Sequence, residues 1–163
     1  MSKRALVCDT TVLLYLERIS QVQLIPALFE PVLVPQPVIW ELDSGRSIRP
    51  DTIDPRSFDW LKVVDITQAE LSQLPPNRLG LGERGVIACA HARPECVAGL
   101  DDRQARLLAE QLGLPVVGTI GILLKAKKVG LIQSVQELLD ALRVHGFRIS
   151  DDIYRQGVKL SNE

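Results

Sequence analysis

Short apolar segments alternate with longer segments of mixed polarity along nearly the whole chain. Each apolar segment is too short for a buried helix and is typical of a strand buried in a parallel sheet. Because these strands alternate with helical segments, the pattern predicts an α/β fold: a three-layer α/β/α sandwich around a central, mainly parallel sheet of about five strands. The predicted strands cover residues 5–8, 32–34, 60–66, 96–100 and 115–118.

Residues that favour the first turn of a helix stand at the start of several segments between these strands. Thr67 is followed by a glutamate three residues later, as in a capping box. Thr10 or Thr11, Thr119 and Ser134 stand where other helices need a cap. The predicted helices cover residues 10–18, 22–29, 37–42, 82–93, 103–112, 120–129, 135–146 and 149–160, with a short one opening at Thr67, and the predicted loops cover residues 44–57 and 74–82.

Length and composition indicate a single domain. The chain has 163 residues, and we expect the domain to span residues 1–158 with a tail at 159–163. The formal net charge of −1 carries no global signal for nucleic acid, so such a partner would need a local patch. No apolar run approaches the ~20 residues that span a bilayer, and no signal peptide is recognisable, so we expect a cytoplasmic protein with no membrane partner. Cys8, Cys89 and Cys96 match no zinc spacing and are expected to be buried thiols.

Acidic residues follow two of the predicted strands and lie near the start of two helices. Asp9 ends the first strand, and Asp101 and Asp102 end the strand at 96–100. Glu41 lies on the helix after the second strand, and Glu83 in the first turn of another helix. Ligand sites in such folds lie outside the carboxyl ends of the strands, so these acids are expected to converge on one cleft.

A cluster of carboxylates suits a hard divalent cation such as Mg²⁺ or Mn²⁺. Each acid also has a simpler explanation, which the sequence leaves open. Asp9, Asp101 or Asp102 could cap the helix that follows it. Glu83 could complement a helix dipole, and Glu41 could be a solvated residue on a helix surface.

Four acidic motifs follow one another along the chain. They are "LVCDTTVLL", "VPQPVIWEL", "LGLGERGVIACAHA" and "GLDDRQARLLAEQLGLPVVGT". In this order they resemble the PIN-domain family from Ala5 to about Val158. The C-terminal segment "GILLKAKKVGLIQSVQELLDALRVHGFRIS" is similar to the branch that contains VapC-type toxins. The resemblance implies a PIN-like fold and an Mg²⁺- or Mn²⁺-dependent ribonuclease, a hydrolase that cuts phosphodiester bonds inside an RNA chain.

The resemblance assigns a role to each acid in turn. Asp9 matches the first metal-binding aspartate, and Glu41 matches the second acid, which lies close to the metal. Glu83 matches the third acid, which is more often aspartate in the wider family. Thr11 matches the small hydroxyl residue that contacts a water on the metal.

The fourth acid of the resemblance is Asp102 or Asp101. Asp102 fits better, because the family pattern counts three residues from the acid to an apolar residue, here Ala105. A slip of one residue would select Asp101 instead. The resemblance therefore implies the catalytic residues Asp9, Glu41, Glu83 and Asp102, and the metal ligands Asp9, Glu83, Asp102 and Asp101.

Basic residues near these acids are candidates for binding RNA phosphates. Arg84, Arg103 and Arg106 flank the third and fourth acids. The lysines within 125–128 end a helix, where cations also stabilise the dipole, so their position has two explanations. The arginines of the 44–57 loop could reach the cleft or be merely solvated.

Three classes of function are compatible with acids at strand ends. The first is the toxin-like ribonuclease, which would act on RNA, form a homodimer and pair with a small antitoxin protein. The second is a catalytically quiet PIN-like module that binds RNA or protein. The third, a receiver domain, would need a lysine in a late-strand turn, and none follows "PVVGT". We therefore favour the ribonuclease.

Overall fold

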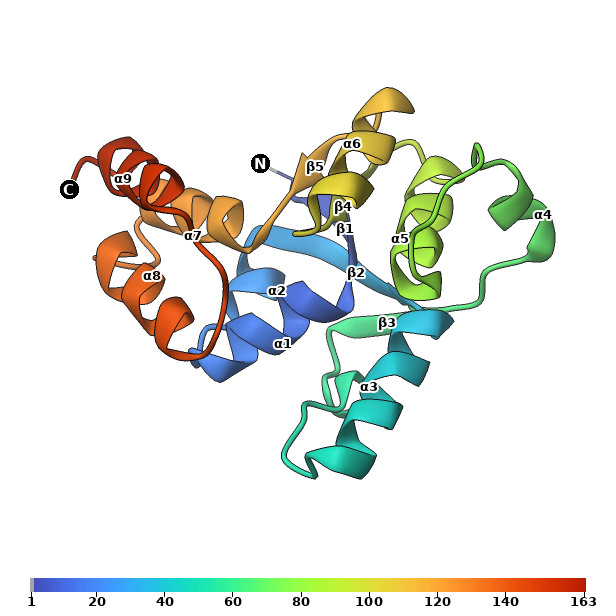
Figure 1. Cartoon of the computed structure of the whole chain (residues 1–163), viewed down its shortest axis with the longest axis horizontal. Coiled ribbons are helices and arrows are strands. Elements are labelled where there is room, and N and C mark those ends of the chain that lie inside the picture. Colours follow the sequence, from blue (N-terminus) through green and yellow to red (C-terminus); the bar gives the residue numbers. More distant parts are fainter. Residues whose placement is uncertain (1) are drawn as a thin grey trace.

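The chain folds around a five-stranded parallel sheet, shown in Figure 1 by a computed structural model that describes residues 2–163. The strand order is β3-β2-β1-β4-β5, and every described pair of neighbours is parallel. The predicted α/β/α fold is confirmed. The strands are β1 (Arg4–Cys8), β2 (Phe29–Pro35), β3 (Leu61–Val64), β4 (Cys96–Gly99) and β5 (Val116–Val117).

Helices cover both faces of this sheet. Figure 1 shows α1, α2 and α7–α9 grouped at one side and α4 and α5 at the other. Helix α5 contacts β1, β2 and β4, and it also packs against α3. The helices are α1 (Thr10–Arg18), α2 (Leu24–Leu28), α3 (Gln36–Ile48), α4 (Gln68–Ser72), α5 (Leu81–His91), α6 (Arg103–Gln111), α7 (Thr119–Lys128), α8 (Val135–Val144) and α9 (Asp151–Leu160), with a 3₁₀ turn at Pro55–Ser57.

The core lies along the central strands and α5. Leu6, Val7 and Cys8 of β1 are fully buried, as expected for a strand covered on both faces. The three cysteines are free thiols and all are buried, which confirms the prediction. None of the helices in residues 2–163 combines the length and apolar character that crossing a membrane requires.

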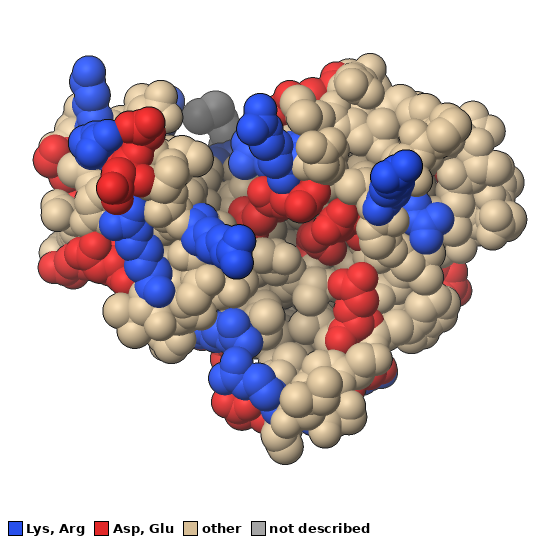
Figure 2. Space-filling model, in the orientation of Figure 1, with Lys and Arg blue, Asp and Glu red and all other residues tan. Residues whose placement is uncertain are grey.

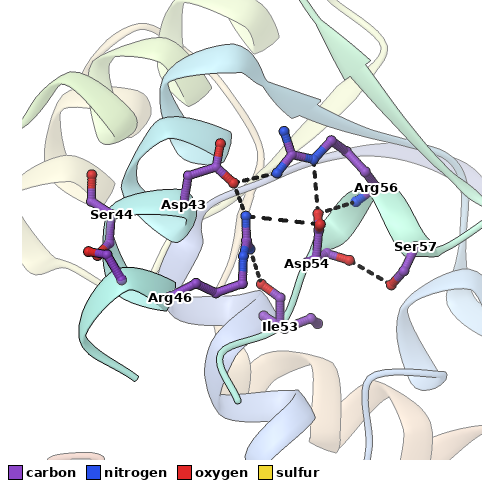
Figure 3. Close-up of polar contacts among 8 residues, drawn as sticks. Asp43, Ser44, Arg46, Ile53, Asp54, Arg56 and Ser57 are labelled. Atoms are coloured by element: carbon purple, nitrogen blue, oxygen red, sulfur yellow. Dashed lines mark hydrogen bonds and ion pairs between the residues drawn. The ribbon is translucent and has the colours of Figure 1, made fainter. Parts of the chain in front are cut away.

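Helix α3 extends well beyond its predicted end. The prediction placed residues 44–57 in a loop, but the helix continues to Ile48. Arg46 lies on this helix, pairs with Asp43 one turn earlier and donates from Nη1 to the carbonyl of Ile53 at 2.8 Å (Figure 3). The polar residues after position 43 therefore form a helical turn stabilised by charged contacts. Arg46 connects this turn to the segment that contains Ile53.

Strand β2 begins earlier than predicted, so α2 ends at Leu28. Phe29 was predicted as the last residue of a helix, but it is a strand residue paired with Arg4 of β1. Its side chain is almost completely buried. Pairing with the central strand therefore outweighs a local pattern that fits either structure.

Two of the predicted caps are confirmed and two are wrong. The hydroxyls of Thr67 and Ser134 accept from backbone amides three residues on, at 3.1 and 3.2 Å. The N-cap residues of α1 and α7 are instead Asp9 and Gly118, and neither uses a side chain as a cap. The threonines expected there bond to carboxylates, which places them in the site described below.

The last residue of the chain is held against the start of α8. The Glu163 carboxylate accepts from the amides of Val135 and Gln136 at 2.6 and 3.1 Å and from the Ser134 hydroxyl at 2.9 Å. Lys127 lies 3.4 Å away as an ionic partner. Burial acts to raise the pKa of Glu163, but these hydrogen bonds prevail and lower it to about 2.

We expect Glu163→Gln to lower the free energy of unfolding by about 1 kcal/mol, the usual cost of losing a helix cap. The melting temperature should fall by about 2–4 °C at pH 7. Because the pKa is depressed, the difference should be full above the unfolded value near 4.5 and disappear as the pH falls through about 2. Thermal melts across this range, with Glu110→Gln on the exposed side of α6 as the control, would test this. A melting temperature equal to that of the wild type would contradict it.

Candidate active site

The carboxyl ends of β1 and β4 lie side by side and position the first acids. Cys8 is in register with Gly99, and the backbone amide of Asp9 donates to the carbonyl of Gly99 at 3.1 Å. Asp101 follows β4 by two residues. The parallel pairing therefore brings Asp9 and Asp101 together at one edge of the sheet, as the sequence predicted.

Asp9 is a buried carboxylate with an unpaired oxygen. The residue is only 4% exposed, and Oδ1 has no hydrogen-bond partner among the described residues. Burial raises the pKa of Asp9 to about 8; the Thr10 amide opposes this shift, while Glu41, Glu83 and Asp101 reinforce it. The explanation of Asp9 as a side-chain cap for α1 is wrong. Its position instead leaves a buried carboxyl group whose Oδ1 has no partner in residues 2–163, so ionising this group is costly.

Glu41 is held at both carboxylate oxygens. Thr10 on α1 donates to Oε2 at 2.6 Å, and the Gly82 amide at the start of α5 donates to Oε1 at 3.1 Å. Glu41 therefore connects α1, α3 and α5 instead of pointing freely into solvent. The contact requires a glycine, because a Cβ on Gly82 would lie 2.7 Å from Cδ and 2.8 Å from Oε2 of Glu41.

Glu83 is the next residue of α5 and faces the same group of acids. Burial raises the pKa of Glu83, and the charges of Asp102 and Glu41 add to the shift. Its place in the first turn also favours a negative charge through the helix dipole. The dipole explanation and a functional role are therefore compatible.

The structure separates the roles of Asp101 and Asp102. Both oxygens of Asp101 accept from Thr119, one from the amide and one from the hydroxyl, each at 2.7 Å. Burial raises the pKa of Asp101. The Thr119 hydrogen bonds and the charge of Arg106 oppose this shift but do not reverse it. Asp102 caps α6, because its Oδ2 accepts from the Ala105 amide at 3.0 Å. The simpler explanation of Asp102 as a helix cap is therefore confirmed. Asp101 therefore lies on the Asp9 side of the site, and Asp102 on the Glu83 side.

Two of the acids, Glu83 and Asp102, line a cleft on the surface. Figure 2 shows acidic side chains gathered in the middle of this face, with basic side chains around them. A cleft of about 650 Å³ opens next to Glu83 and Asp102. A negatively charged cavity of this kind attracts cations and needs one before it can accept an anionic substrate.

Comparison with known protein families agrees with this arrangement. Residues 5–163 match a family model described as a PIN domain. The chain belongs to the PIN-domain family. A search of curated proteins finds no match for it. PIN domains are generally nucleases, which places this one in a nuclease-type fold family, whereas its closeness to VapC toxins stays a prediction.

The residues of this PIN domain fit a divalent cation, although no three His, Cys, Asp or Glu side chains of residues 2–163 form a ready-made metal cage. The donors available are carboxylate oxygens, which Mg²⁺ and Mn²⁺ prefer, and Mg²⁺ needs only one or two of them because it keeps several waters. The unpaired Oδ1 of Asp9 is the observation that supports the fit. A cation beside it would offset the charge that burial otherwise disfavours.

The three predicted RNA-binding arginines differ in their surroundings. Arg106 lies beside the site, because a Cβ on Gly118 would lie 2.9 Å from Asp101 Oδ1 and 3.0 Å from Arg106 Nη1. Arg84 is partly buried, and its Nε has no partner among the described residues. Arg103 is exposed at the first position of α6. Two of the lysines at the end of α7 have structural contacts, with Lys125 over the Phe29 ring and Lys127 beside Glu163.

Sequence reasoning missed the residues that hold the acids in place. Thr119 was interpreted as a helix cap, and Gly82 as the start of a helix. Thr10 was considered only as a cap or turn residue at the start of the first helix, whereas the resemblance selected Thr11 as the functional hydroxyl. In the structure it is the hydroxyl of Thr10 that bonds to an acid of the site. These partners come from other elements, so no spacing along the chain could identify them.

Proposed function

We propose that this PIN domain is a divalent-metal-dependent endoribonuclease that uses Mg²⁺ or Mn²⁺. The observation that supports this proposal is the buried and unpaired Asp9 carboxylate, surrounded by Glu41, Glu83 and Asp101. Such an arrangement destabilises the free protein, and groups of this kind are concentrated at functional sites. The site lies at the carboxyl edge of a parallel sheet, and the family is one of nucleases, so we assign phosphodiester hydrolysis to it.

Each acid has a distinct part in this proposal. Asp9, Glu83 and Asp102 would hold the ion, with Asp101 as a further ligand on the Asp9 side. Glu41, fixed by Thr10 and Gly82, would lie close to the ion as the second acid of the site. When bound, the ion would offset charge on the phosphate and lower the pKa of a water.

The reaction itself is an in-line hydrolysis. The oxygen of a water forms a bond to phosphorus as the bond from phosphorus to the leaving ribose oxygen breaks. A carboxylate of the site or bulk solvent accepts the proton of the attacking water, and the leaving oxygen takes up a proton from solvent. Arg106, beside Asp101, is the cation that we assign to a phosphate of the bound strand.

The decisive experiment incubates purified protein with a mixed RNA pool and Mg²⁺ or Mn²⁺, with chelated samples and Asp9→Asn in parallel. We expect cleavage that requires the metal and falls by about 10²–10³-fold in the variant, a loss typical of removing one electrostatic catalytic group. Equal cleavage by both proteins would refute the assignment of Asp9. Stabilisation by metal that depends on Asp9, without cleavage, would favour the quiet binding module.

We further propose that this nuclease is the toxin of a toxin–antitoxin pair, acting as a homodimer. Support comes from the resemblance of residues 121–150 to VapC-type toxins. Expression of the wild-type protein should then arrest growth, and Asp9→Asn should not. Unimpaired growth with soluble, nuclease-active wild-type protein would contradict the toxin role, and sedimentation would test the dimer separately.

A further inference from the structure

Most of the side chains that line the cleft beside Glu83 and Asp102 are apolar or carry amide groups. One wall is a face of α6 that repeats at helical spacing, and the other is the loop at residues 76–80. Its volume of about 650 Å³ lies within the ~300–1,000 Å³ typical of small-molecule sites. The helix wall is formed by Gln104, Leu107, Leu108 and Gln111.

Apolar walls and amide groups make this cleft suited to a flat, neutral ligand. Leu79 and Leu107 contribute apolar surface, and Leu107 is 41% exposed despite its size. The side-chain amides of Gln104 and Gln111 each offer donors and an acceptor. A phosphate would be repelled by the two carboxylates at the acidic end of the cleft.

The loop wall is fixed by its own hydrogen bonds. The Asn77 amide nitrogen donates to the carbonyl of Pro75 at 2.9 Å, and its oxygen accepts from the Leu79 amide at 3.0 Å. Asn77 therefore shapes the loop and is not free to bind a ligand. Its neighbour Arg78 lines the cleft and provides a planar guanidinium, a group on which bases stack.

From these features we infer that the cleft binds one unpaired nucleobase of single-stranded RNA, next to the phosphodiester that the acids cut. The inference rests on the proposed function, because only a strand held at the acids would place a base here. Gln104 and Gln111 would read the edge of the base, while Leu107 and Arg78 would cover its faces. The cleft would thus give the nuclease its sequence preference.

Binding without cleavage tests the cleft directly. The wild-type protein, in Mg²⁺, would be titrated with fluorescent single-stranded RNA tetranucleotides of each base and with a fully abasic one, in all of which a methylene group replaces the leaving oxygen of each linkage so that the strand resists hydrolysis. The cleft variant adds Gln104→Ala, Leu107→Ala and Gln111→Ala, and the control adds Glu110→Ala on the same helix outside the cleft. Circular dichroism would confirm that all of them fold.

We expect at least one base-bearing strand to bind about tenfold more tightly than the abasic strand, an effect of the size of one stacked base. The cleft variant should lose this preference, and the control should keep it. Equal binding of all strands, no binding of any strand, or a preference that survives in the cleft variant would overturn the inference.

Cleavage assays distinguish this failure from failure of the proposed function. If wild-type protein cuts RNA but shows none of the expected base preference, the cleft inference fails alone. If wild-type protein cuts nothing, the proposed function fails, while the titrations still report on the cleft.

Discussion

Replacing Gly82 by alanine is expected to reduce RNA cleavage by about 100-fold, although the substitution adds only a methyl group. The new Cβ would meet the Glu41 carboxylate well inside van der Waals distance, with Cδ at 2.7 Å. Glu41 would have to move and lose its hydrogen bond from the Gly82 amide. A displacement of about 1 Å in an active site can lower the rate by about 10²-fold.

Gly45→Ala provides a matched control on α3, the helix that carries Glu41. A Cβ there would meet only Thr52 Cγ2, at an ordinary distance of 3.7 Å. Its cleavage rate should equal that of the wild type. Since alanine favours helices over glycine by about 1 kcal/mol, neither variant should unfold. Full activity of Gly82→Ala would show that the position of Glu41 is unimportant for cleavage.

Asp9→Asn is expected to stabilise the metal-free protein as the pH rises, while removing its response to metal. The pKa of Asp9 is about 8 in the folded chain and near 3.8 when unfolded. Unfolding therefore releases a proton between these values, so wild-type stability falls progressively from pH 4 to pH 8. Below this window the carboxyl is protonated in both states and the penalty is absent.

Thermal melts in a chelator and in Mg²⁺ would measure both effects. At pH 8 without metal, Asp9→Asn should melt about 4–8 °C above the wild type, because a penalty of about 2 kcal/mol for the buried unpaired group corresponds to this shift at about 2–4 °C per kcal/mol. The advantage should be absent at pH 4. Mg²⁺ should raise the melting temperature of the wild type and leave that of the variant unchanged. Equal melting of the two proteins in the chelator at pH 8 would show that Asp9 carries no such penalty.

The acids at the strand ends could be predicted because parallel topology follows from the alternation of strands and helices. Once β1 and β4 are neighbours, Asp9 and Asp101 must share an edge. The contacts that fix each carboxylate were beyond reach, because Thr119 and Gly82 approach from elements distant in the sequence. Local patterns also failed at α3, where charged pairs continue a helix through residues that resemble a loop.

The hydrogen bonds between Thr119 and Asp101 have a consequence for transplanting this site to another protein. Asp101 belongs to the turn after β4, but its orientation is set by the first residue of α7. Gly118 must also stay small, since a Cβ there would lie 2.9 Å from Asp101 Oδ1. A chimera that imports the β4–α6 segment alone would carry the acid without the groups that orient it. The smallest segment that carries Asp101 together with the groups that orient it therefore runs from β4 through the first turn of α7.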